Sequence, residues 1–253
     1  MNARQGMAAV AILGLLAASA VADWERTISA WDTKLPDEGN VQLSLWGSYW
    51  EWEAGRADGN TLEARLYADY GIADNWSLSI APGFTRWDVD HGGDEAGIAD
   101  TYLMTTYRFI DEAASGFDMA VMGSVSLPTG DDDDGLGTGN VEPGVTLLAS
   151  KDLSPVVAVA NAGAFMILDA DRGEEDYVLH GSLEGIYPLS EQLSLNAVVS
   201  AATARWDKGD DDADVGVGAR VTPTEQMFLV GAVYYSLTDN YDWGFQVAAG
   251  AEF

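Results

Sequence analysis

The densest cluster of potential ligands in this chain is a run of four consecutive aspartates: Asp131, Asp132, Asp133 and Asp134. Carboxylate oxygens suit Ca²⁺ and Mg²⁺, so all four are candidates for a divalent-cation site. The run does not follow the EF-hand pattern, because taking Gly135 as the central glycine puts Gly130 at the first ligand position. A solvated acidic loop without a ligand is the other interpretation. Apart from Ca²⁺ or Mg²⁺ at acidic loops, we expect no cofactor.

Catalytic chemistry has few candidate residues. The chain has no cysteine and only two histidines, His91 and His180, and it contains neither a P-loop nor an HExxH motif. His180 shares one face of an alternating segment with Ser182 and Glu184, a combination found in hydrolases. Neighbours two residues apart along a strand are separated by about 6–7 Å, which is beyond hydrogen-bond reach. We therefore expect no enzymatic activity.

The charge balance is strongly acidic. Asp and Glu number 41 against 12 Lys and Arg, which gives a formal net charge of −29. Such a surface cannot offset phosphate charge, so a nucleic-acid partner is excluded. The excess of carboxylates suits divalent cations, cationic solutes or a saline environment.

The N-terminus has the pattern of an export signal. Arg4 precedes an apolar run over residues 7–18, and small residues follow up to Ala22. The run is too short for a comfortable membrane span, so residues 1–22 are predicted to be a cleaved signal peptide. Residues 23–40 are polar and irregular, and we predict a periplasmic N-terminal segment there.

From residue 41 onward, the chain alternates in polarity with a period of two, which is typical of β-strands. About twelve such segments are separated by turn residues: 41–53, 61–71, 75–88, 97–110, 116–128, 140–151, 155–168, 175–188, 191–206, 213–223, 226–237 and 241–253. Connections after even-numbered segments are short, as in TPTEQ, whereas those after odd-numbered segments are mostly longer and acidic, as in WDKGDDDAD. This asymmetry is typical of outer-membrane barrels. We predict an all-β fold, a transmembrane antiparallel barrel over residues 41–253 with both termini periplasmic.

Aromatic residues support a location in the bacterial outer membrane. They gather near the segment ends, as amphipathic rings do at the two water–lipid boundaries. The alternating last segment ends on Phe253, which resembles the C-terminal signal that the barrel insertion machinery recognises. We expect that machinery, outer-membrane lipid and lipopolysaccharide to be partners. Two features fit less well: segments 155–168 and 226–237 are apolar on both faces, and Pro82 interrupts a strand, which predicts a bulge at Pro82-Gly83.

Three stretches in order are similar to a known family: YGIADNWSLSIAPGF, GIADTYLMTTYRFIDE and SVSLPTGDDDDGLGTGN. They resemble the outer-membrane barrels named for the meta-cleavage pathway of phenol degradation. The resemblance covers about residues 70–155, and the aspartate run is denser than that pattern implies. It implies uptake of aromatic or otherwise apolar compounds.

The barrel interior is predicted to hold the charged side chains that alternate with the apolar ones. The predicted lumen or transport residues are Glu63, Arg65, Asp69, Asp100, Arg108, Glu142, His180, Glu184 and Arg220, and Asp118 and Glu252 share their orientation. They form either a salt-bridge network that fills the barrel or a polar path that sorts solutes. Twelve strands lie between the filled eight-stranded and the open sixteen-stranded barrels. We therefore predict passage of small solutes, with a closed structural or adhesive barrel bearing acidic, cation-binding outer loops as the alternative.

Overall fold

The computed structural model describes residues 27–28, 31–54, 57–90, 92–206, 209–238 and 241–253. The predicted signal peptide and His91 therefore lie outside the described residues. The described strands are β1 (Val41–Ala54), β2 (Ala57–Ala73), β3 (Trp76–Val89), β4 (Asp94–Ile110), β5 (Asp118–Leu127), β6 (Glu142–Asp152), β7 (Val157–Met166), β8 (Tyr177–Ser190), β9 (Leu193–Ala202), β10 (Asp212–Thr224), β11 (Met227–Ser236) and β12 (Trp243–Glu252), with a short helix α2 (Glu112–Ser115) between β4 and β5.

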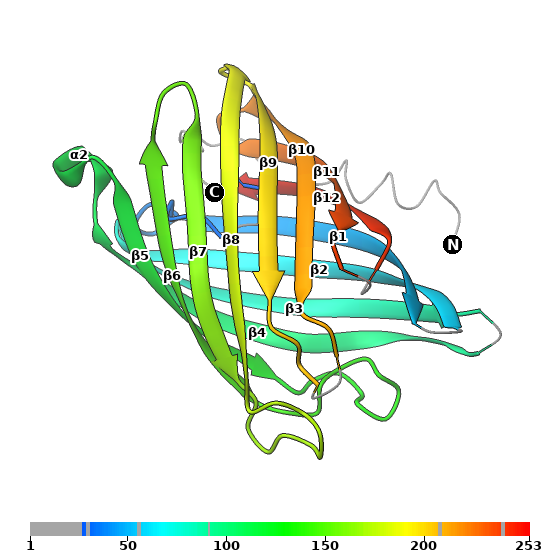
Figure 1. The fold of residues 1–253 in the computed structure, drawn as a ribbon. Helices are drawn as coiled ribbons and strands as arrows, with labels where there is room; N and C mark the ends of the chain where they lie inside the picture. The colour runs from blue at the N-terminus through cyan, green and yellow to red at the C-terminus, as the bar shows by residue number, and fades with distance from the viewer. Residues whose placement is uncertain (1–26, 29–30, 55–56, 91, 207–208, 239–240) are drawn as a thin grey trace.

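The strands form one closed barrel, which confirms the predicted fold. Each strand pairs with its neighbours in chain order, and β12 returns to pair with β1 (Figure 1). This closing contact is antiparallel and runs from Gln42 opposite Glu252 to Glu51 opposite Trp243. The backbones of Val41 and Phe253 extend it with hydrogen bonds of 3.1 and 2.9 Å. Closure leaves no sheet edge, as a spanning sheet requires.

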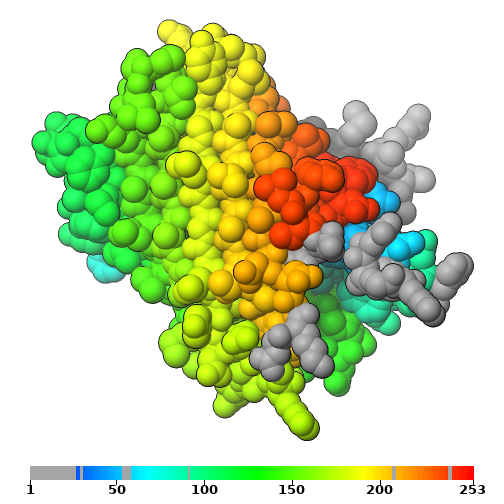
Figure 2. All heavy atoms as spheres, viewed as in Figure 1, coloured from blue at the N-terminus to red at the C-terminus, as the bar shows by residue number. Residues whose placement is uncertain are grey.

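Large apolar side chains cover the outside of this barrel. In β11, Leu229, Val233 and Tyr235 are exposed, whereas Phe228 and Tyr234 on the other face are buried. The same alternation recurs around the wall, whose side chains form a continuous surface over β5–β10 (Figure 2). In water such a surface would be strongly unfavourable, whereas in hydrocarbon it is the ordinary exterior of a barrel. Within the described residues, no helix is both long and apolar enough to cross a membrane.

The two ends of the barrel differ in their connections, as predicted. At one end, which we call the short-turn end, the connections include residues 74–75, 191–192 and 225–226. The opposite, long-loop end carries residues 128–141, 167–176 and 203–211 (Figure 1). Two predicted long loops are instead mostly strand, because β2 begins at Ala57 and β4 at Asp94. A paired hairpin can continue into water without alternating apolar and polar residues. The polarity pattern therefore did not predict that these strands extend beyond the membrane.

The predicted bulge at Pro82 is present, and an arginine completes it. The register between β3 and β4 shifts between Ala81 and Gly83, where Pro82 has no N–H to contribute. Nη1 of Arg65 donates to the carbonyls of Ala81 and Asp100, at 2.9 and 2.8 Å. Arg65 therefore stabilises the interrupted wall by hydrogen-bonding carbonyls beside the bulge.

Part of the N-terminal segment lies inside the barrel. Ile28 and Thr33 are fully buried, and their contacts are with inward-facing side chains of β5, β6, β8 and β11. We call residues 27–28 and 31–36 the inner segment. The polar, irregular composition of residues 23–40 predicts a separate periplasmic segment and does not indicate this placement inside the barrel.

Candidate permeation path

The lumen contains two cavities that share a boundary at the inner segment. The inner cavity, of about 150 Å³, is lined by residues 31–32 and 34–36 and by side chains of the barrel wall. The outer cavity, of about 700 Å³, runs from Trp31 to residues of the long-loop end, among them Thr138, Arg205 and Tyr241. Trp31 and Met104 line both cavities. The cavities therefore follow one another along the barrel interior.

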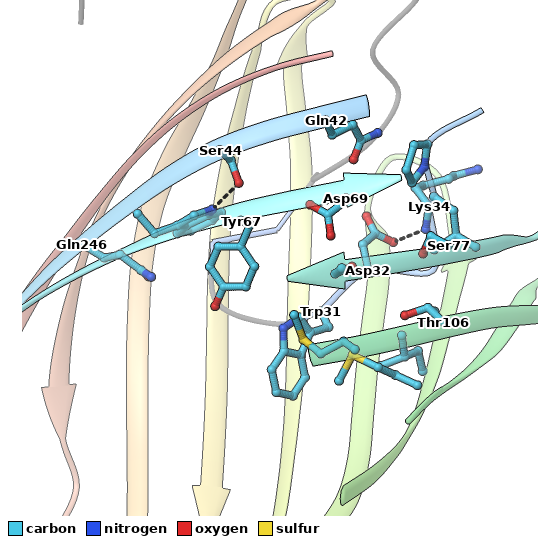
Figure 3. A pocket seen from close by; sticks show the side chains of 17 residues that line it. Trp31, Asp32, Lys34, Gln42, Ser44, Tyr67, Asp69, Ser77, Thr106 and Gln246 are labelled. Carbon is cyan, nitrogen blue, oxygen red and sulfur yellow. Dashed lines mark hydrogen bonds between the residues drawn. The ribbon is translucent and has the colours of Figure 1, made fainter. Parts of the chain in front are cut away.

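Small polar side chains and a few apolar ones surround the inner cavity. Gln42 and Ser44 from β1, Tyr67 and Asp69 from β2 and Ser77 from β3 converge on it (Figure 3). Their chain positions follow from the period of two, which turns every second residue of a strand to the same face. The lining offers hydrogen-bond partners together with the rings of Trp31, Trp46 and Tyr67.

The outer cavity combines aromatic and polar groups. Its rings come from Trp50, Tyr102, Phe165 and Tyr241 in addition to Trp31. Serine, threonine and asparagine side chains lie between them: Ser124, Ser126, Thr146, Asn161, Ser182 and Ser200. Such a mixture can accept a ring by its faces and edges and a polar substituent by hydrogen bonds.

Buried hydrogen bonds hold the inner segment at Ile28. The N–H of Ile28 donates to Oε1 of Glu184 at 2.8 Å, and the hydroxyl of Tyr234 donates to the carbonyl of Ile28 at 2.9 Å. Nδ2 of Asn196 donates to the same Glu184 oxygen at 2.6 Å. Glu184 is completely buried, so its carboxylate serves the segment rather than a solute.

Further contacts fix the segment between Trp31 and Lys34. The contacts are Asn161 Nδ2 to Trp31 O at 3.0 Å, Thr33 Oγ1 to Ser150 Oγ at 2.7 Å, and Lys34 Nζ to Asp118 Oδ2 at 3.6 Å. Asp118 is almost completely buried, and its carboxylate also accepts the Glu112 N–H at 2.7 Å. Backbone and side chains of the segment are thus tied to β5, β6 and β7.

The loop with the four aspartates is organised by Asp100. Its carboxylate accepts the N–H groups of Gly130 and Thr138 at 3.0 and 2.7 Å and the Thr138 hydroxyl at 3.0 Å. Nε1 of Trp87 also donates to the carbonyl of Asp134 at 2.9 Å. All four aspartates are exposed to solvent. Among the described residues, no three His, Asp or Glu side chains gather where they could hold a metal ion, and the cation site remains a prediction.

An arginine that the sequence analysis missed joins two loops at the outer mouth. Arg205 is ion-paired with Glu142 and, through its Nε, with Glu174 at 2.7 Å. Burial alone would lower the pKa of Arg205, but hydrogen bonds and charge attraction from the two carboxylates raise it above the ordinary value. The 191–206 segment was predicted as strand to its end, whereas β9 stops at Ala202 and leaves Arg205 in the loop.

The three predicted lumen arginines contact the wall and not one another. Arg65 lies over the Tyr102 ring at 4.2 Å while bonding the bulge. Arg108 lies at the short-turn end, where Nη2 donates to the carbonyl of Asp74 at 3.0 Å. Arg220 donates to the Thr222 hydroxyl at 3.1 Å. These contacts assign the three guanidinium groups to the wall and its turns.

Three members of the predicted set line a cavity: Asp69 the inner one, and Glu142 and His180 the outer one. Nε2 of His180 is 3.0 Å from Oγ1 of Thr146, so its described partner is not Ser182. Glu63 is exposed on the inward face of β2, and Glu252 accepts Asn40 Nδ2 at 2.7 Å. The aromatic lining was missed because the prediction considered charged residues, although Trp50 and Tyr102 have the inward parity.

The model of one known protein family matches most of this chain. The model of a family described as "Putative MetA-pathway of phenol degradation" matches residues 32–253, which include all twelve strands. The chain belongs to this family. The resemblance recognised in the sequence motifs is thereby confirmed. Among curated proteins, none matches the sequence.

Solved structures with the same fold include a close geometric match. The crystal structure of an outer membrane channel from Pseudomonas putida F1 is similar to 90% of this chain and 100% of its own, at 15% identity and a TM-score of 0.71. The beta domain of the Bordetella autotransporter BrkA reaches 0.55 at 12% identity, covering 85% of this chain and 99% of its own. The KdgM porin reaches 0.54 at 11% identity, covering 84% and 99%. These likenesses show the fold of an outer-membrane barrel, and the apolar exterior agrees with that location.

Proposed function

We propose that this protein lets small solutes cross the outer membrane through the barrel lumen, and that these solutes carry an apolar ring and a polar group. The observation that carries the proposal is the pair of cavities that meet at Trp31 and together extend along the lumen. Membership of a family named for phenol degradation supports it, as does the likeness to a structure named an outer membrane channel.

The size of the inner cavity agrees with a single-ring solute. An apolar cavity of about 150 Å³ in another protein binds benzene, and the inner cavity has about that volume. Its polar lining, with Ser44, Ser77 and Gln42, also offers partners to a hydroxyl or carboxyl substituent. The outer cavity, with several rings in its lining, could collect such a solute before it reaches Trp31.

The charges at the outer mouth favour cations over anions. Glu142, Asp212 and Asp214 line the outer cavity together with Arg205, which is itself paired with Glu142 and Glu174. Clefts with an excess of one charge concentrate ions of opposite sign. The small-ion current through the lumen is accordingly cation-selective.

Planar bilayers containing the purified protein test the proposal. We expect resolved single-channel current steps in concentrated KCl. In a KCl gradient, the sign of the reversal potential should show that K⁺ passes more readily than Cl⁻. Heat-denatured protein is the control. Absence of steps at every salt concentration would overturn the proposal and favour the closed structural or adhesive barrel with acidic outer loops.

The proposal includes the partners expected of an outer-membrane protein. The exposed apolar residues of the exterior would contact lipid and lipopolysaccharide, and the terminal strand with Phe253 would be read by the insertion machinery. A variant in which Phe253 is deleted should assemble less efficiently into the membrane, which heat-modifiability on gels measures.

A further inference from the structure

The inner segment puts one large side chain where the two cavities meet. Trp31 lines both cavities, and the residue is 41% exposed although it lies inside the barrel. Figure 3 shows it among the side chains that line the inner cavity. Met104 also lines both cavities, but it is buried in the wall at 8% exposure. The exposed surface of Trp31 therefore faces empty lumen.

The backbone that carries Trp31 is fixed on both sides. Its own carbonyl accepts from Asn161, Ile28 is bonded to Glu184 and Tyr234, and Thr33 is bonded to Ser150. Removing the segment would break all four hydrogen bonds at once, and three of them are buried. The indole ring, in contrast, touches His180 edge-on, with ring centroids 6.0 Å apart and an interplanar angle of 74°. A single edge-on contact of this kind holds a ring less firmly than buried hydrogen bonds hold a backbone.

We propose that Trp31 is the residue that sets the size limit for passage, and that it does so as a ring on a stationary backbone. The inference rests on the proposed function and adds to it the residue that determines specificity. Solutes move from the outer to the inner cavity past the indole, so the space beside this ring decides what fits. The bonded residues Ile28 and Thr33 on either side of it position Trp31.

Swelling of proteoliposomes in a graded series of uncharged sugars tests the size limit. The Trp31→Ala variant should admit a sugar that the parent protein excludes. The size limit of Trp31→Phe should lie between those of the parent protein and Trp31→Ala. Trp243→Ala, which removes an indole from the lipid-facing side of β12, is the matched control and should keep the parental limit. An unchanged limit in both Trp31 variants would overturn the inference.

A covalent lock separates movement of the ring from movement of the segment. The chain has no cysteine, and the side-chain oxygens of Thr33 and Ser150 lie 2.7 Å apart, so the double variant Thr33→Cys/Ser150→Cys can form a single disulfide. With the disulfide verified by mass, the parental limit should persist, and adding Trp31→Ala should still enlarge it. Blocked passage that reductant restores would show that the segment must leave the lumen, and would overturn the inference of a stationary backbone.

The same experiments distinguish the two proposals. If neither the parent nor any Trp31 variant passes ions or sugars, the channel function fails. If all of them pass solutes with one common limit, the channel function stands and only the role of Trp31 fails.

Discussion

The two ends of the lumen use carboxylates for different purposes. Toward the short-turn half, Glu184 holds the backbone of Ile28, and donor and acceptor are both completely buried. At the long-loop end, Asp100 holds the backbone of Gly130 and Thr138, and Thr138 is exposed to solvent. Both carboxylates accept backbone N–H groups, but only the donors at the outer mouth can turn to water when the acceptor is lost.

The difference in solvent access determines what the loss of a carboxylate would cost inside the lumen and at the outer mouth. Inside the lumen, an unpaired donor remains desolvated, so the carboxylate contributes to the stability of the whole barrel. At the mouth, rehydration limits the loss, so the carboxylate mainly fixes the shape of a loop. Glu184 and Asp100, both predicted as lumen residues, therefore each hold a chain segment in position.

The largest effect is expected for Glu184→Ala. It leaves the N–H of Ile28 and the amide of Asn196 without their common acceptor, which should lower the free energy of unfolding by about 3 kcal/mol. Glu184→Gln keeps one acceptor oxygen and should lose less. Urea unfolding in lipid vesicles, followed by tryptophan fluorescence, measures both. Equal losses in the two variants would contradict the assigned role.

A smaller and local effect is expected for Asp100→Ala. Three hydrogen bonds to the loop disappear, and the protection of its amides should fall by about 1–2 kcal/mol. Hydrogen exchange at Gly130 and Thr138 reports this change, while the urea midpoint of the barrel should move little. Exchange that stays at the parental rate would show that Asp100 does not organise the loop.

Arg205→Gln should cost less still. Its guanidinium side chain is 25% exposed, and partly solvated ion pairs contribute about 1 kcal/mol or less. The parental protection of the loops around Glu142 and Glu174 should decrease with added salt, whereas the variant should be insensitive to it. Hydrogen exchange measured at several salt concentrations distinguishes the parent protein from the variant. Identical salt dependence would show that the ion pair does not stabilise these loops.

The smallest effect is expected at the aspartate run. Changing Asp131, Asp132, Asp133 and Asp134 to Asn should leave the melting temperature without divalent cations unchanged, because all four are exposed. A solvated loop predicts no response to Ca²⁺ in either protein, and this is the result that their exposure favours. A Ca²⁺-dependent rise in the parent that the variant lacks would instead establish the cation site.

Much of the wall was predictable from the sequence because a spanning strand must alternate. Lipid and lumen impose opposite polarities on successive residues, so the twelve strands, their order and the bulge at Pro82 followed from period and turn residues. Strand ends beyond the bilayer were less certain, since β2 and β4 continue into water, where no alternation is imposed.

The contents of the lumen were less predictable. Residues 23–40 have no period, and nothing in their composition states that they run inside the barrel. One clue was present: β11 is apolar on both faces, and its inner residues Phe228 and Val230 pack in one cluster with Ile28. The role of Arg65 depends on carbonyls that only the folded bulge brings near it, so its type and parity indicated a lumen charge and nothing more.

The most direct test of the account is to measure which faces of the barrel are wet. Because the chain has no cysteine, single substitutions Ser79→Cys, Ser124→Cys and Val247→Cys each introduce one thiol, in the inner cavity, the outer cavity and the exterior respectively. Ser79 and Ser124 are half-buried, so both keep some exposed surface in the lumen. In membranes, a small water-soluble thiol reagent should label the first two and leave the third unmodified. Labelling of Val247→Cys, or protection of both Ser79→Cys and Ser124→Cys, would contradict a barrel with a lipid-facing exterior and a water-accessible lumen.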